Sequence, residues 1–182
     1  MEKRWVLLLW CLGVLWFGCA LAQEKTTAPG FSTVEQAGDP SFVADWLKQN
    51  GTVVDRTEAN RFFEVGMREK QKKNWSAATK AFGESMIRYP SPQALAEYAE
   101  AELQMLGEIR SRDKSYEQNK LPDLAHALNY IRSALAADSA LETMPKAERG
   151  KTQLNADCLS VYIQSGKHQG ICPLLEAYGL MR

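Results

Sequence analysis

Two histidines and four cysteines are the residues of this 182-residue chain that could do nucleophilic or metal chemistry. Cys158 and His168 could form a nucleophile and its base, because an imidazole activates a neighbouring thiol. The surrounding sequence shows neither an oxyanion-hole loop nor an orienting carboxylate. Metal ligation by Cys158, His168 and Cys172 would lack a C-x-x-C motif and a fourth ligand. We therefore expect a protein that is not an enzyme, with no catalytic residue, metal or cofactor.

The first 22 residues have the composition of an export signal. Lys3 and Arg4 precede an uncharged, mostly apolar run that ends in the A-x-A sequence of residues 20–22. These three parts characterise a secretory signal peptide. The run is slightly short for a permanent anchor, which needs about 20 apolar residues. We predict a signal peptide over 1–22 and a periplasmic or secreted protein without a membrane span after cleavage. The alternative is a lipid anchor through Cys19.

Cleavage of the signal peptide would also determine which cysteines remain to pair. It would remove Cys11 and Cys19 and leave Cys158 and Cys172. An even number of cysteines in an exported chain favours a disulfide. The two residues lie on either side of a predicted turn at 165–168, and antiparallel helices would place them roughly opposite each other. We expect a bond between Cys158 and Cys172, the alternative being two buried thiols.

The net charge of the chain bears on its possible partners, and residues 23–56 lead into the predicted helical domain. With 22 basic and 22 acidic residues and no basic block among aromatics, the chain is not expected to bind nucleic acid. Residues 23–38 contain Thr, Ala, Pro and Gly without periodicity, which predicts a flexible linker. Residues 39–56 predict a short amphipathic helix and a loop, because Pro40 follows the helix-capping Asp39 and Trp46 belongs to an apolar stripe. We expect this helix to cover the open face of the first hairpin described below; the alternative is docking to a partner.

The stretch from Phe62 to Pro92 predicts two helices folded back on each other. Small residues at Gly66 and Ala78 would let the two backbones approach closely, and Phe82 would fill the wider end of the wedge. Glycine costs roughly 1 kcal/mol of helix propensity against alanine, so Gly66 has a packing reason. The second helix ends before Pro90, which lacks an N–H.

This spacing resembles the tetratricopeptide repeat, in which a small residue, an alanine, an aromatic and a proline recur at fixed separations. Gly66, Ala78, Phe82, Ser85 and Pro90 stand at those separations. A second unit repeats part of the pattern after extra residues at about 107–121, and a third runs through helices at about 145–165 and 171–181. The residues of the second unit that match are Ala127, Ile131 and Ala134. The resemblance implies an all-α fold over 57–182, a right-handed stack of about three antiparallel helical hairpins.

The resemblance also implies a function in binding. In that family the first helices line a groove, which here would include Phe63, Met67, Lys70, Gln71, Gln104 and Met105. One subclass grips a terminal carboxylate with Lys and Asn where this chain has Phe63 and Met67. The groove would instead suit a hydrophobic peptide or helix, unless the helix containing Trp46 covers both residues. We expect an adaptor or assembly factor of the cell envelope that binds a protein or peptide. The alternative is an inhibitor or immunity protein that blocks an exported enzyme or toxin.

Overall fold

The computed structural model describes residues 31, 33–52, 54–168 and 170–181. The predicted signal peptide, Cys19 and most of the predicted linker lie outside these residues. Every regular element within them is a helix, and none is a strand, so the all-α prediction is confirmed. Across the same residues, no helix combines the length and the apolar character that crossing a membrane requires.

The helices begin and end where the sequence provides caps and breakers. Asp39 accepts hydrogen bonds from the backbone N–H groups of Ser41 and Phe42, and Ser91 accepts one from Ala94. Each of these caps is followed by a proline in the first turn. The elements are α1 (Val34–Ala37), α2 (Pro40–Asn50), α3 (Thr57–Gln71), α4 (Trp75–Arg88), α5 (Pro92–Arg112), the 3-10 helix η1 (Lys114–Asn119), α6 (Lys120–Leu141), α7 (Lys146–Ser165) and α8 (Pro173–Ala177).

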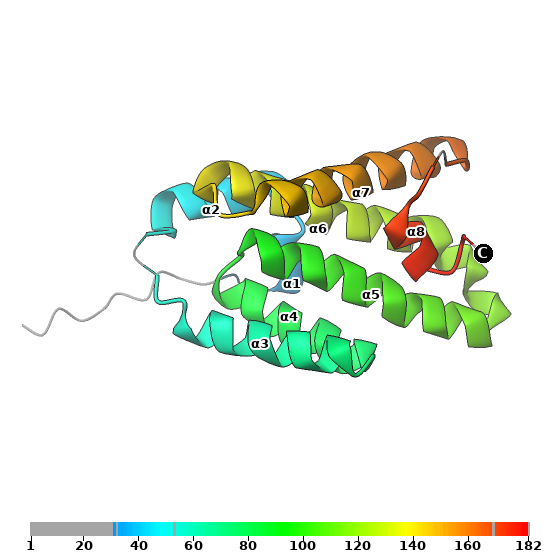
Figure 1. Ribbon diagram of the computed structural model, residues 1–182, viewed down its shortest axis with the longest axis horizontal. Coiled ribbons are helices and arrows are strands. Elements are labelled where there is room, and N and C mark those ends of the chain that lie inside the picture. The colour runs from blue at the N-terminus through cyan, green and yellow to red at the C-terminus, as the bar shows by residue number, and fades with distance from the viewer. Residues whose placement is uncertain (1–30, 32, 53, 169, 182) are drawn as a thin grey trace, which may run out of the picture.

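The long helices pack in chain order, each against the next, from α3 to α7. Figure 1 shows that α3, α5 and α7 lie toward the viewer, whereas α4 and α6 lie behind them. The core fills the space between these two layers. Ala78, Phe82, Ala127 and Ala134 are fully buried there, and Ile131 almost so. The layer formed by α3, α5 and α7 therefore has one face on the core and one face free to line a groove.

Gly66 marks the closest approach of α3 and α4. A Cβ atom on Gly66 would lie 2.5 Å from the ring of Phe82, nearer than such atoms ever come. One turn beyond Phe82 along α4, the hydroxyl of Ser85 donates a hydrogen bond of 2.8 Å to the carbonyl of Ala59. Small residues and one internal hydrogen bond thus hold the first hairpin together.

The N-terminal segments differ from the sequence prediction. Residues 34–37 of the predicted linker form α1, which Thr33 caps and which buries Ala37. The helix α2 packs mainly along α6 rather than over α3. The reason lies in α6, whose buried side chains spread over more than one face of the helix and so need several partners. The prediction that α2 covers the open face of the first hairpin was therefore wrong.

Cys158 and Cys172 lie at disulfide distance, with Cα atoms 5.9 Å apart, as predicted. The geometry around them differs from two facing helices. The last helix, predicted over 171–181, spans five residues, and Cys172 directly precedes it. It starts at Pro173, and the chain beyond it turns at Gly179, whose φ of +78° favours glycine.

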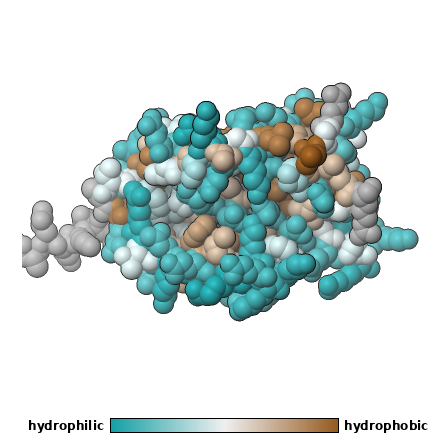
Figure 2. All heavy atoms as spheres, in the orientation of Figure 1, coloured by the Kyte–Doolittle hydropathy of each residue, from teal (hydrophilic) through white to brown (hydrophobic). Residues whose placement is uncertain are grey.

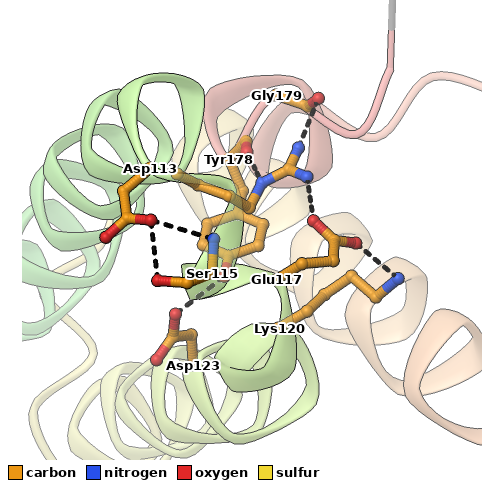
Figure 3. A network of polar contacts seen from close by, with 8 residues as sticks. Asp113, Ser115, Glu117, Lys120, Asp123, Tyr178 and Gly179 are labelled. Carbon is orange, nitrogen blue, oxygen red and sulfur yellow. Dashed lines mark hydrogen bonds and ion pairs between the residues drawn. The ribbon is translucent and has the colours of Figure 1, made fainter.

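A polar network holds this last segment on α5 and α6 (Figure 3). Arg110 donates hydrogen bonds to the carbonyls of Tyr178 (3.3 Å) and Gly179 (2.7 Å) and forms an ion pair with Glu117. The buried Tyr178 donates its hydroxyl hydrogen to Asp123 over 2.7 Å. The C-terminal segment is thus anchored at both Cys172 and Tyr178.

Candidate binding groove

A groove of about 450 Å³ lies between α3, α5 and α7, and the turn from α6 to α7 also contributes to its lining. Its apolar lining comes from α3, α5, α6 and this turn: Phe63, Met67, Ala96, Ile131, Met144 and Pro145. The residues that α7 contributes are polar or charged: Glu148, Lys151, Thr152 and Asn155. Figure 2 shows brown and pale residues in the middle of this face, with hydrophilic residues around them. An apolar hollow with a polar rim is the usual form of a binding site.

Phe63 and Met67 are one helical turn apart on α3 and therefore point to the same side. Both side chains are half-buried. The ring of Phe63 packs on that of Phe82, with centroids 5.6 Å apart, so its inner edge belongs to the core. Its outer edge faces the groove. No residue of α2 lines the groove, so the helix that contains Trp46 does not cover Phe63 and Met67.

Ion pairs tie the three helices of the groove together. Lys70 of α3 pairs with both Glu97 and Glu100 of α5, and Glu100 also pairs with Lys151 of α7 at 3.2 Å. Burial alone would raise the pKa of Glu100, but Lys70 and Lys151 outweigh it and hold this pKa below its usual value. Burial alone would lower the pKa of Lys70, but the two carboxylates raise it. Lys70 and Glu100 are therefore charged at neutral pH, and their ion pairs hold α3, α5 and α7 together beside the groove.

Asn155 is the polar residue of the α7 wall that the fold leaves unsatisfied. Its side chain is 4% exposed, and its Oδ1 atom has no hydrogen-bond partner among the described residues. The neighbouring Thr152, also in this wall, donates its hydroxyl hydrogen to the carbonyl of Glu148 over 2.9 Å. A buried amide without a partner is uncommon in folded proteins and calls for an explanation.

The groove continues beyond Phe63. A second hollow of about 230 Å³ shares Phe63, Gln93 and Thr143 with the first and extends to Arg56 and Tyr89. The combined hollow is therefore elongated. It runs from the α7 wall past α3 toward the turn between α4 and α5.

The structure places the predicted groove residues in different surroundings. Phe63 and Met67 line the groove, and Lys70 lies at its edge in the ion-pair network. Gln71 is exposed at the end of α3. Gln104 and Met105 follow farther along α5, where Met105 lines a separate hollow with Trp75 and Ile109.

Several groove residues escaped the sequence analysis. Glu97, Glu100, Lys151 and Asn155 were not proposed, although Glu100 stands where the repeat pattern has a small residue, a departure that could have drawn attention to it. No sequence signal marks Asn155, because its lack of a partner depends on what the other helices place beside it.

A second cluster of titratable groups lies between α5 and α6. His126 contacts the buried Glu102, with Nδ1 and Oε2 3.1 Å apart, and Tyr98 donates a hydrogen bond to the other oxygen of Glu102. The hydrogen bond between His126 and Glu102 raises the pKa of His126, and burial opposes this shift. Tyr130, whose ring packs on His126, donates its hydroxyl hydrogen to the carbonyl of Val34 in α1. The cluster thus joins α1, α5 and α6.

The cysteine chemistry considered from the sequence has no free thiolate, because the sulfur of Cys158 lies against that of Cys172. Within the described ranges, no three histidine, cysteine or acidic side chains gather as metal ligands would. The groove is therefore the feature of the described structure that best suits a functional site. Comparison of the chain with protein-family models, with curated proteins and with solved structures finds no match in any of the three.

Proposed function

We propose that this protein is a non-enzymatic adaptor or assembly factor that binds a protein or peptide in the groove between α3, α5 and α7. The observation that carries the proposal is the apolar floor at Phe63 and Met67, which no other helix of the described residues covers. Contact with a partner would remove this floor from water, which favours association. The ion pairs of Lys70 hold the groove in shape before a partner arrives, so little order has to be imposed on binding.

Two further points support the proposal. The spacing of Gly66, Ala78 and Phe82 resembles tetratricopeptide repeats, whose stacked hairpins commonly bind peptides or protein surfaces. The pairing of Cys158 with Cys172 suits an oxidising compartment, and hence a protein of the cell envelope or one that is secreted. In this proposal, residues 1–22 direct export, and partner binding takes place outside the cytosol.

Replacing Phe63 and Met67 together by serine tests the proposal. The matched control replaces Leu154 and Val161, which are 49% and 48% exposed on α7 and do not line the groove. Proteins captured from the envelope fraction by the tagged wild-type chain are identified by mass spectrometry. We expect the groove variant to lose these proteins and the control variant to keep them.

Thermal melts of both variants complete this experiment. Loss of capture without a large fall in melting temperature would support the groove as the binding site. Equal capture by wild type and groove variant would contradict the proposal. A large fall in melting temperature would instead assign Phe63 and Met67 to the core.

A further inference from the structure

We infer that the groove binds an extended stretch of polypeptide and that Asn155 hydrogen-bonds to the main chain of that stretch. The inference rests on the proposed function, since it specifies what the groove takes. Its starting point is Asn155, which is 4% exposed in the groove wall and whose side-chain oxygen Oδ1 is buried without a hydrogen-bond partner among the described residues.

The chemistry of a primary amide defines what would satisfy it. Whichever way the group is turned about its last bond, it presents an acceptor and a donor side by side. A main-chain peptide offers the complementary pair, an N–H and a C=O. Leaving the amide of Asn155 unpaired is costly in the free protein, so a partner that supplies both groups gains affinity.

The same requirement distinguishes an extended segment from a helix. The N–H and C=O groups within a helix are bonded to each other along its length. An extended segment leaves both groups free to bond to a surface. Asn155 therefore favours an extended occupant, although the apolar floor at Phe63 and Met67 would accept either form.

The shape of the groove agrees with an extended occupant. The two hollows that share Phe63, Gln93 and Thr143 form one elongated depression. Alternate side chains of an extended segment point to the same side, so one could lie on Phe63 and Met67 while the main chain passes Asn155.

The charges of the rim specify the occupant further. Glu97 and Glu100 are already paired with Lys70, and Glu100 also with Lys151. The carboxylate of Glu148, exposed on the α7 wall, has no ion-pair partner in the part of the chain that the structure describes. The occupant we infer thus carries a large apolar side chain and a lysine or arginine that can reach Glu148.

A selection followed by backbone substitution tests the inference. The full chain is used to select binders from a displayed library of random dodecapeptides, and the strongest binder is synthesised with each peptide nitrogen methylated in turn. N-methylation removes one main-chain donor and leaves every side chain in place. We expect one position at which methylation weakens binding to the wild-type chain about tenfold.

Two variants show whether Asn155 accepts that hydrogen bond. Asn155→Leu should bind the unmodified peptide about tenfold more weakly and should lose the sensitivity to methylation at that position. Asn129→Leu makes the same change at an exposed position of α6 outside the groove and should bind like the wild type. The cycle of two chains and two peptides isolates the single contact.

The outcomes separate this inference from the proposed function. If no peptide is enriched, or if the selected peptides still bind after Phe63 and Met67 are changed to serine, the proposed function fails together with the inference. If binding needs Phe63 and Met67 but methylation affects wild type and Asn155→Leu equally, only the role of Asn155 is overturned. A bound peptide that is helical by NMR would overturn the extended form.

Discussion

Gly66 and Gly83 are both helical glycines, yet their surroundings give them opposite roles. A Cβ atom on Gly66 would come within 3 Å of three ring atoms of Phe82, which is fully buried and has little room to move. A Cβ atom on Gly83 would meet Tyr98 and Val34 at 3.6 Å, an ordinary contact. The two positions therefore form a matched pair for testing how α3 and α4 pack.

We predict that Gly66→Ala destabilises the protein and that Gly83→Ala stabilises it. The clash with Phe82 should cost about 1–3 kcal/mol, which outweighs the gain of about 1 kcal/mol in helix propensity. At Gly83 the gain in propensity should remain, up to about 1 kcal/mol. Urea unfolding of both variants measures the difference. Equal shifts in the same direction would contradict the contact between Gly66 and Phe82.

Some residues of the groove were predicted from the sequence and others were missed, for a physical reason. The contact of Gly66 with Phe82 and the shared face of Phe63 and Met67 follow from helical spacing within one hairpin. The unsatisfied amide of Asn155 follows from what α3 and α5 place opposite α7. Such cross-helix relations depend on the complete packing, which spacing along the chain does not encode.

At the scale of elements, the sequence located the helices better than their partners. The end of α4 at Arg88 agrees with the prediction, because Pro90 lacks an N–H and cannot continue a helix. The partner of α2 was missed because an amphipathic stripe indicates that a helix has a buried face but not what buries it. Only the packing shows that α6 takes α2 as a third neighbour beside α5 and α7.

The segment around α8 gives a prediction at this scale. Cys172 and Pro173 begin a helix of five residues, too short to be stable alone, so its position depends on anchors. One anchor is the pairing with Cys158, 14 residues earlier; the other is the network of Arg110 with Tyr178 and Gly179. In the chain-entropy account, closing a loop of this length contributes about 3 kcal/mol.

We therefore expect replacement of Cys158 and Cys172 by alanine to destabilise the protein by about 3 kcal/mol. In hydrogen exchange, amides of α8 should exchange faster in the variant, whereas those of α3 and α4 should change little, because these helices do not touch α8. Non-reducing peptide mapping of the wild-type protein provides the control. Free thiols at both positions in that protein would contradict the predicted bond.

At the scale of the whole molecule, two clusters of charged side chains join segments far apart in the sequence. The network of Lys70, Glu100 and Lys151 connects α3, α5 and α7. The pair of Glu102 and His126 connects α5 to α6 and lies beside α1. Because the pKa of Glu100 is lowered and the pKa of His126 is raised, these two groups should support the fold in different pH ranges.

The lowered pKa of Glu100 determines how the stability of the fold changes at acid pH. A carboxyl whose pKa is lower in the folded chain adds stability above its unfolded pKa, near 4.5. This contribution is lost as the pH falls through the folded pKa. Protonation of Glu100 would also break its ion pairs with Lys70 and Lys151, so the link between α5 and α7 should weaken once the pH falls below the folded pKa.

The raised pKa of His126 determines how the stability of the fold changes near neutral pH, and this shift gives the last prediction. The charged groups that face His126 are Glu102 of α5, Glu35 of α1 and Asp123 of α6, and all three favour its protonated form. Because the folded pKa lies above the unfolded value of 6.5, the stabilisation is fully present below that value. It is lost as the pH rises through the folded pKa.

Stability of the wild-type chain should therefore decline from about pH 6 to about pH 9 more steeply than that of His126→Gln. The measurement is the urea midpoint across this range, with His168→Gln as the control that should follow the wild type. Parallel profiles for the wild type and His126→Gln, or an NMR titration that places the His126 pKa at or below 6.5, would contradict the pairing with Glu102.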